Sequence, residues 1–240
     1  MGVAYGVNPT WAAQTDAGRI HIATKAVVQS GLVLNLDAGA STSYPGSGTT
    51  WTDLSGNGNN GTLNGPTYNS ANGGSIVFDG SNDYVNISVP TSINTKTILS
   101  FIRVTASGGD YVVYGLDANG SDNWFGVNEN LVRLFGTQSS NVNNFSLSGT
   151  TNILTNTWYQ IGCTIDGATA KVFLNGVEEN SVTQAFTIGA WDSSPTLGRR
   201  GSIAQRYFPG SIANLQVYNR VLTAAEIQQN FKALRGRYGI

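Results

Sequence analysis

Residues 156–176, NTWYQIGCTIDGATAKVFLNG, contain the pattern from which the fold is first inferred. Apolar residues alternate in the first half of this stretch, which places them on one face of a β-strand. The alternating residues are Tyr159, Ile161, Cys163 and Ile165. The stretch ends with Asn175-Gly176, a pair that tolerates positive φ and therefore suits a tight turn. We predict a pair of antiparallel strands here, with Trp158 and the unreactive thiol of Cys163 buried in the core.

Similar short apolar runs, separated by turns, follow one another through most of the chain. The 240 residues include 30 glycines, and Asn-Gly pairs recur between the runs. These pairs begin at Asn57, Asn60, Asn64, Asn119 and Asn175. Because no helical segments separate the runs, a parallel βαβ arrangement is excluded. The pattern predicts an all-β fold, a two-sheet antiparallel jelly-roll sandwich of about a dozen short strands.

The predicted strands can be given by residue range. We expect them at 31–37, 75–80, 83–89, 97–104, 110–117, 123–127, 130–136, 145–149, 158–166, 170–176, 177–182, 195–198 and 211–219. Residues 51–68 are expected to form a loop with little strand content, with Trp51 in the core. Residues 75–87 are expected to form one strand–turn–strand unit through Asp79-Gly80.

One short helix is predicted near the C-terminus. Thr223 is a suitable N-cap, and Glu226 three residues later completes a capping box. The apolar residues that follow recur at helical spacing and should face the sandwich. They are Ile227, Phe231 and Leu234. Gly236 is placed to end the helix.

The composition restricts the class of protein. Forty per cent of the residues are hydrophobic and 11% are charged, which is the balance of a globular chain. The formal net charge is −1 and the basic residues are scattered, so we expect no binding to nucleic acid. The single cysteine excludes an intrachain disulfide. We also expect neither a signal peptide nor a membrane-spanning segment.

Residues 1–30 differ from the rest, because they are rich in small residues and lack sustained periodicity. We interpret them as an N-terminal arm for docking or oligomerisation, and residues 31–240 as the sandwich. The arm holds apolar side chains that need a partner surface to bury them. They are Val3, Tyr5, Val7, Trp11, Ile20, Ile22, Val27 and Val28.

Four segments in sequence order resemble the concanavalin A-like lectin/glucanase superfamily, in particular its laminin-G-like, pentraxin-like branch. They are 31–39 with 51–65, then 75–87, 156–176 and 210–227. The resemblance covers about residues 31–233 and implies a lectin-like sandwich. Modules of this form are similar to those of bacteriophage virion proteins, which implies a context but not a function.

The superfamily includes glycoside hydrolases, which need two carboxyl groups beside the scissile bond. The glutamates here are Glu129, Glu178, Glu179 and Glu226, and none has a carboxylate partner at strand spacing. His21, the sole histidine, lies in the arm without a serine or acid beside it. We therefore predict that the protein is not an enzyme.

The resemblance to the pentraxin-like branch suggests calcium as a possible cofactor. Asp122-Asn123 matches the pair that would open one side of such a site. Arg199-Arg200 stands where the second acidic cluster would follow, and two cations there would repel Ca²⁺. We predict no cofactor, with Asp122 and Asn123 in an ordinary turn as the alternative to a calcium site.

Sugar binding usually needs an exposed aromatic platform with polar groups nearby. Trp124, Trp191 and Tyr207 are candidates because each lies in or beside a predicted loop, although most aromatic residues of a sandwich pack in the core or at an interface, and we favour that role for these three.

Two functions remain after these exclusions. The first is a virion structural protein, a capsid decoration or a tail or fibre component. Its arm would bind other virion proteins or copies of itself, and its sandwich would be displayed on the virion surface after synthesis in the host cytoplasm. The alternative is a soluble carbohydrate-binding adhesin that recognises surface glycans.

Overall fold

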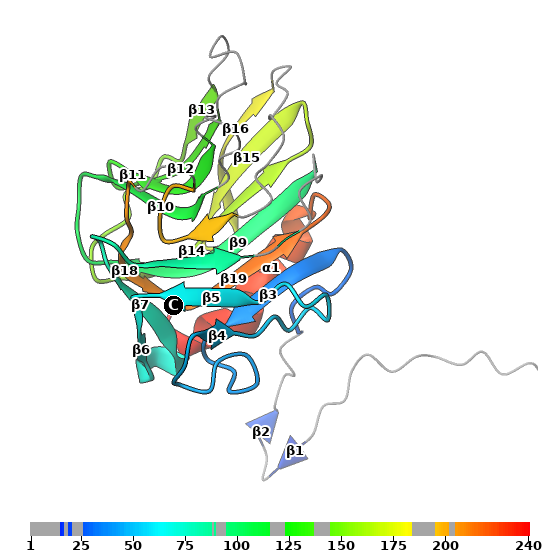
Figure 1. The fold of residues 1–240 in the computed structure, drawn as a ribbon. Helices are drawn as coiled ribbons and strands as arrows, with labels where there is room; N and C mark the ends of the chain where they lie inside the picture. The colour runs from blue at the N-terminus through cyan, green and yellow to red at the C-terminus, as the bar shows by residue number, and fades with distance from the viewer. Residues whose placement is uncertain are drawn as a thin grey trace, which may run out of the picture.

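The structure is a computed structural model that describes residues 26–87, 89, 95–115, 123–136, 145–183, 195–201 and 205–240. It also describes the backbone of two short strands, β1 (Thr15–Asp16) and β2 (Arg19–Ile20), which pair antiparallel. Every strand pairing in these residues is antiparallel. The main body is a sandwich of two sheets, as predicted (Figure 1).

The first sheet has eight strands in the order β13-β12-β11-β10-β17-β8-β5-β4. Their bounds in chain order are β4 (Thr50–Trp51), β5 (Gly61–Asn64), β8 (Tyr84–Ile87), β10 (Asp110–Gly115), β11 (Trp124–Asn128), β12 (Leu131–Gly136), β13 (Phe145–Ser148) and β17 (Thr196–Leu197).

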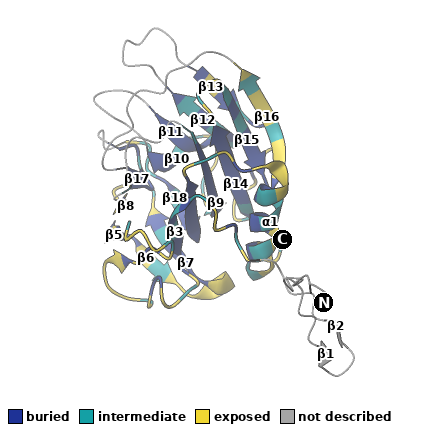
Figure 2. Ribbon diagram, turned by 90° about the vertical axis from the view of Figure 1, so that its right-hand side faces the viewer, coloured by how far each residue is buried: buried dark blue, intermediate teal, exposed yellow. Residues whose placement is uncertain are grey.

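The second sheet runs in the order β16-β15-β14-β9-β18-β7-β6, with β19 pairing to β9 and to β3. The bounds are β3 (Leu32–Asp37), β6 (Thr67–Asn69), β7 (Ser75–Asp79), β9 (Lys96–Val104), β14 (Trp158–Ile165), β15 (Thr169–Leu174), β16 (Val177–Thr183), β18 (Pro209–Ile212) and β19 (Asn214–Tyr218). Figure 2 shows buried residues along β9 and β14 and exposed ones along β16 at the edge.

The hairpin predicted at 156–176 is formed by β14 and β15. Cys163 lies in the main core between the sheets, and burial raises the pKa of its thiol. Trp51 and Trp158 are also buried. The alternating pattern therefore identified the core face of this strand correctly.

Residues 51–68 were predicted to be a loop, and this is wrong. They contain the end of β4, all of β5, which pairs with both β4 and β8, and part of β6. Gly61 is a core position of β5 rather than a turn, since a Cβ there would lie 2.9 Å from Val85 Cγ1. Small polar residues on β5 concealed it, because Leu63 is its one large apolar side chain.

Residues 75–87 do not form a strand–turn–strand unit within one sheet. β7 pairs with β6 and β18 in the second sheet, whereas β8 pairs with β5 and β17 in the first. Asp79 accepts hydrogen bonds from the backbone of Ser81 and Asn82, and Gly80 has a φ of 78°. The connection thus carries the chain from one sheet to the other.

The predicted helix is α1 (Ala224–Leu234), with the Thr223–Glu226 capping box formed. Ile227, Phe231 and Leu234 are buried, as predicted. Gly236 does not end it in a left-handed conformation. Instead Arg235 continues into a 3₁₀ turn (Arg235–Arg237), and the positive φ of 72° occurs at Gly239. No helix in the described part of the chain is long and apolar enough to span a bilayer.

The boundary predicted after residue 30 is placed too late. Val28 is 8% exposed in a core cluster with Tyr218 and Ile227. Its N–H donates to Asn230 Oδ1 (2.8 Å), and its carbonyl accepts from the Tyr218 hydroxyl (2.9 Å). The sandwich therefore begins by Val28. The arm residues Val3, Tyr5, Val7, Trp11 and Ile22 and the side chain of Ile20 lie outside the described residues.

We predict different outcomes for two N-terminal deletions. Deleting residues 1–25 should leave the free energy of unfolding close to that of the full chain, because the described contacts with the sandwich begin at Ala26. Deleting residues 1–28 should lower it by about 3 kcal/mol, because Val28 and its two hydrogen bonds are lost. Urea unfolding measures both. Equal stability of the two variants would contradict the revised boundary.

A second prediction concerns pH. The hydrogen bond from Arg220 to Glu226, opposed by burial and aided by Thr223, lowers the pKa of that carboxyl from 4.5 to about 2. This stabilisation is complete above the unfolded pKa and is lost as the pH falls from 4.5 toward 2. The stability difference between wild type and Glu226→Gln should therefore be largest at neutral pH and shrink in acid. A difference independent of pH in urea unfolding would refute this account.

Candidate ligand-binding face

The outer face of the eight-stranded sheet is the face turned away from the core. On β11, Phe125 and Val127 belong to the core, so the alternate residues Trp124 and Asn128 point outward. On β12 the same alternation turns Val132 and Leu134 inward. Its outward residues are Arg133 and Phe135, with Phe135 opposite Trp124 in the register.

A covering segment, residues 198–201 and 205–208, lies over β10 on this outer face. A hydrogen bond from Phe208 N to Gly198 O (2.8 Å) joins the two ends of the segment. A second bond, from Val112 N of β10 to Arg206 O (3.1 Å), attaches the segment to the sheet. Gly115 is required beneath it, because a Cβ there would lie 2.5 Å from Arg199 O and 2.7 Å from Gly201 N. The covering segment thereby brings Arg199 and Arg206 onto the face.

Three arginines and three aromatic rings meet on this face. Arg199 Cζ lies 3.6 Å from the ring centre of Tyr84, and Arg206 Cζ lies 5.3 Å from that of Trp124. Arg133 Cζ lies 5.9 Å from the centre of Phe135, whose ring stacks on Trp124 at 5.9 Å. Each pairing has cation–π geometry. We call this set the arginine–aromatic row. Its members are Tyr84, Arg199, Arg206, Trp124, Phe135 and Arg133.

Hydrogen bonds between strands hold part of the row. Arg206 Nε lies 3.3 Å from Asp110 Oδ2, and Asn128 donates to the other oxygen of Asp110. Arg133 Nη1 donates to Asn128 Oδ1 (2.6 Å) and to Ser148 Oγ (3.3 Å). Arg206 also has a φ of 54°, which is costly for a residue with a Cβ. The network and the strained backbone fix these guanidinium groups before any ligand arrives.

Three N–H groups of the row are buried without a hydrogen-bond acceptor among the described residues. They are Trp124 Nε1, Arg133 Nε and Arg199 Nε. A buried donor without a partner costs about 1–3 kcal/mol, so native proteins contain few of them. Such atoms also occur away from this face, on Trp51, Trp158, Gln160 and Tyr238, so they are not particular to the row.

The predicted sugar-platform residues lie in different places. Trp124 is 2% exposed because Phe135 and Arg206 pack over its ring, so it offers no open platform and fits the packing alternative. Tyr207 is half-buried in the covering segment. Trp191 lies outside the described residues. The other members of the row were not predicted, since no local pattern shows that these residues meet.

Comparison with known proteins supports the fold. A family model of the concanavalin A-like lectin/glucanases superfamily matches residues 79–228. The chain belongs to this superfamily. A comparison with curated proteins finds no match.

Several solved structures share the sandwich of this superfamily member. The binding domain of botulinum neurotoxin serotype D aligns with a TM-score of 0.68 and 13% identity. That of Paraclostridial Mosquitocidal Protein 1 aligns with a TM-score of 0.65 and 16% identity. Each alignment covers 85% of this chain and 52% of the other, so the chain spans about half the length of these toxin domains.

Domain 4 of AbnA, a GH43 extracellular arabinanase from Geobacillus stearothermophilus, was solved in complex with arabinotriose. It aligns with a TM-score of 0.62 and 19% identity, over 84% of this chain and 98% of that one. At these identities the three likenesses show a common fold.

Because the superfamily contains glucanases, the positions of the four glutamates matter. Glu178 pairs with Lys171 (2.8 Å), and Glu226 is bonded in the helix cap. Burial acts to raise the pKa of Glu179, but hydrogen bonds from Thr150 and Thr151 lower it overall. Glu129 lies in the turn between β11 and β12 with a φ of 49°. Among the described residues, none of the four is paired with a second carboxylate.

The calcium hypothesis rests on residues that are only partly described. Asn123 is buried beside β11, and Asp122 lies outside the described residues. Where the second acidic cluster would stand, Arg199 stacks on Tyr84 and Arg200 is buried. No group of three or more histidine, cysteine or acidic side chains in the described ranges is arranged to hold a metal.

We predict that calcium does not stabilise the protein. The two arginines of the covering segment would repel the ion, so EDTA should shift the melting temperature by no more than about 2 °C. Differential scanning calorimetry with and without Ca²⁺ measures this. A large calcium-dependent rise in melting temperature that Asp122→Ala abolishes would show that the site exists.

Proposed function

We propose that this sandwich is a non-catalytic module that binds carbohydrate on the outer face of the eight-stranded sheet. The observation that carries the proposal is the arginine–aromatic row, which places half-buried rings and half-buried guanidinium groups together on one outer face. A saccharide can contact both kinds of group. Its hydroxyl and ring oxygens accept hydrogen bonds, and its C–H faces pack against aromatic rings.

The partial exposure of the row supports this use. Tyr84 and Phe135 are half-buried and remain accessible at its two ends. Trp124 between them is fixed by stacking and contributes its indole N–H rather than an open ring face. The arabinanase domain, whose solved structure contains arabinotriose, has the same fold over nearly its whole length, which agrees with a binding role.

The positions of the four glutamates support a module without catalysis. The described glutamates are engaged in an ion pair, a helix cap, loop hydrogen bonds and a strand turn. A retaining or inverting glycosidase would need two carboxyl groups facing each other across the substrate. The geometry therefore favours recognition over hydrolysis.

A virion setting for the module is also part of the proposal. It is supported by the resemblance of the sequence to bacteriophage virion modules and by the apolar side chains of the arm, such as Trp11. In this setting the arm binds other virion proteins or further copies of the chain, and the sandwich is displayed on the particle surface as a capsid decoration or a tail or fibre component. A soluble adhesin would use the same face without that attachment.

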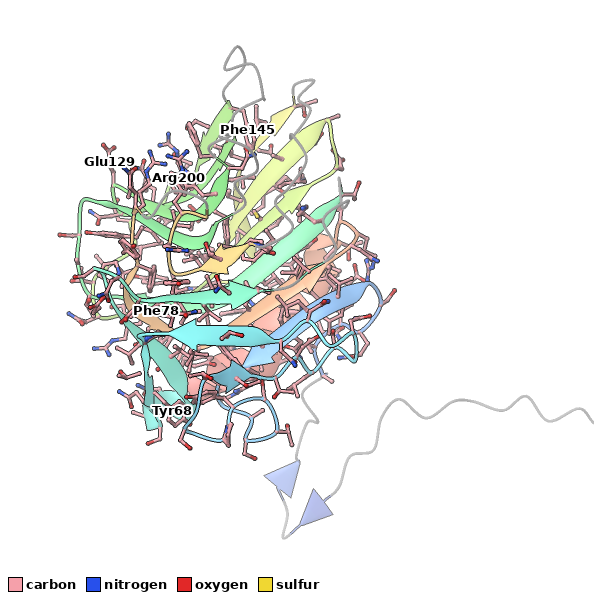
Figure 3. The ribbon with its side chains drawn as sticks, in the orientation of Figure 1. Tyr68, Phe78, Glu129, Phe145 and Arg200 are labelled. Atoms are coloured by element: carbon pink, nitrogen blue, oxygen red, sulfur yellow. The ribbon has the colours of Figure 1, made fainter. Side chains whose placement is uncertain are left out.

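The carbohydrate proposal predicts which aromatic residues matter. In a glycan-array screen followed by calorimetric titration, wild type should bind at least one glycan. Tyr84→Ala and Phe135→Ala should each weaken that binding about tenfold, because each removes a ring that packs on the sugar. Tyr68→Ala is the matched control. Tyr68 is half-buried and contacts Tyr44, and Figure 3 shows it at the far end of the molecule from Arg200.

The same samples test catalysis. The bound glycan should release no reducing ends on prolonged incubation. Release that is lost in Glu129→Gln or Glu178→Gln would overturn the non-catalytic part of the proposal. Binding that Tyr68→Ala weakens as much as Tyr84→Ala would place the site elsewhere.

A further inference from the structure

We infer that the saccharide recognised by the arginine–aromatic row is acidic, with carboxylate or sulfate groups held by Arg199 at one end of the row and by Arg133 at the other. This inference rests on the proposed function and specifies its ligand. The shared chemistry is an oxyanion on a sugar ring, which a uronic or sialic acid carries as carboxylate and a sulfated sugar carries as sulfate ester.

The first argument is charge. The chain has a net charge of −1, yet four of its 13 basic residues lie on β12 or in the covering segment. They are Arg133, Arg199, Arg200 and Arg206. In Figure 3 nitrogen atoms gather around Arg200, on the side of the molecule that also carries Glu129. The described carboxylate bonded within the row is Asp110. A neutral sugar would give no reason for this concentration of guanidinium groups.

The second argument is how the arginines are partnered. Arg206, Arg220 and Arg237 each pair with a carboxylate, at 3.3, 2.6 and 2.5 Å. No carboxylate of the described residues lies within ion-pair distance of Arg199 or Arg133. Arg199 is instead held flat against Tyr84, and Arg133 is oriented by Asn128 and Ser148. Both side chains are therefore positioned but not neutralised.

The third argument is the donors that remain. Nε of Arg133 and Nε of Arg199 are buried and have no acceptor in the described part of the chain. Guanidinium groups bind carboxylate and sulfate through two parallel N–H groups, and the edge that contains Nε is suited to this. The Trp124 indole N–H lies in the same row and supplies a further donor. These donors are buried in the free protein, so an oxyanion reaches the Nε edges when the half-buried arginine side chains shift toward it, and it then brings two oxygens where a hydroxyl brings one.

Nucleic acid also carries oxyanions, but the face does not favour it. Binding a polyphosphate backbone needs an extended basic surface, whereas here the basic residues are interleaved with Asp110 and three half-buried or buried rings. The overall charge of the chain is slightly negative. Acidic groups spaced along a saccharide suit the few guanidinium groups of this face better than a polyphosphate backbone does.

The experiment compares four immobilised probes by surface plasmon resonance with the full chain. They are polygalacturonate for carboxylate, dextran sulfate for sulfate, neutral dextran, and a single-stranded oligonucleotide. Wild type should bind one or both acidic polysaccharides and neither other probe. Arg199→Gln and Arg133→Gln should each weaken that binding about tenfold or more, because a charge-assisted hydrogen bond is lost.

Arg235→Gln is the matched control. It removes the same charge, and Arg235 likewise lies over an aromatic ring, 5.7 Å from the centre of Phe231, but at the end of α1. Its binding should equal that of wild type. Circular dichroism melting should show that all three variants remain folded. Arg199→Lys should restore only part of the affinity, since lysine keeps the charge but loses the fork of parallel donors.

Each other outcome has a definite meaning. Binding to neutral glycans alone would overturn this inference and leave the proposed function intact. Absence of binding to any glycan, here and on the array, would overturn both. Equal losses in Arg199→Gln and Arg235→Gln, or equal binding to the oligonucleotide, would show attraction by general charge and would also overturn it. The relative responses to polygalacturonate and dextran sulfate identify which oxyanion is preferred.

Discussion

The packing of two antiparallel sheets on one shared core is the constraint on which the rest of this structure depends. Each strand gives one face to that core, so each sheet keeps a second face for which another solution is needed. The two sheets solve this differently. The nine-stranded sheet is covered by α1 and the C-terminal residues. There Phe231 and Tyr238 pack against Phe101 and Trp158. The eight-stranded sheet is covered by a polar segment instead.

This difference determines where a ligand can bind. Beneath α1 the outward residues include apolar Phe101 and Trp158 and polar Gln216, and all three are buried. Asn230 of the helix bonds to Val28 N, to the Tyr218 hydroxyl and to Gln216. On the other sheet the covering segment leaves half-buried guanidinium groups and half-buried rings on the outer face, whereas Nε1 of Trp124 and Nε of Arg133 and Arg199 are buried. Arginine side chains over a sheet bury less apolar surface than a helix with an apolar face would. The proposed binding role accounts for this arrangement.

How much the sequence could predict follows from the range of each interaction. The β14–β15 hairpin and the α1 capping box depend on residues a few positions apart, and both were predicted correctly. β5 was missed because a four-residue strand of Gly, Thr, Leu and Asn has almost no apolar alternation and is specified by its neighbours β4 and β8. The laminin-G-type resemblance was recognised because several such local patterns occur in a fixed order.

The candidate site could not be predicted in the same way. Tyr84 and Arg199 lie more than a hundred positions apart and meet only because β17 pairs with β8. Trp124 was a candidate for sugar binding from its place beside a loop, with packing in the core or an interface as the favoured alternative. It is buried because Phe135 on the next strand and Arg206 from the covering segment pack against it. Pairwise strand order, which no local pattern contains, thus decides both the burial of Trp124 and the composition of the row.

The positions of the chain ends agree with a module that is attached on one side and binds on the other. Ala26, where the described sandwich begins, accepts a hydrogen bond from Gln229 of α1, and Arg237 near the C-terminus bonds to Asp37 of β3. Both contacts belong to the nine-stranded layer. The arginine–aromatic row belongs to the eight-stranded layer and faces away from it. The described N-terminal end of the sandwich and the row therefore lie on opposite layers, so a partner bound beside Ala26 and a ligand bound at the row would not occupy the same surface.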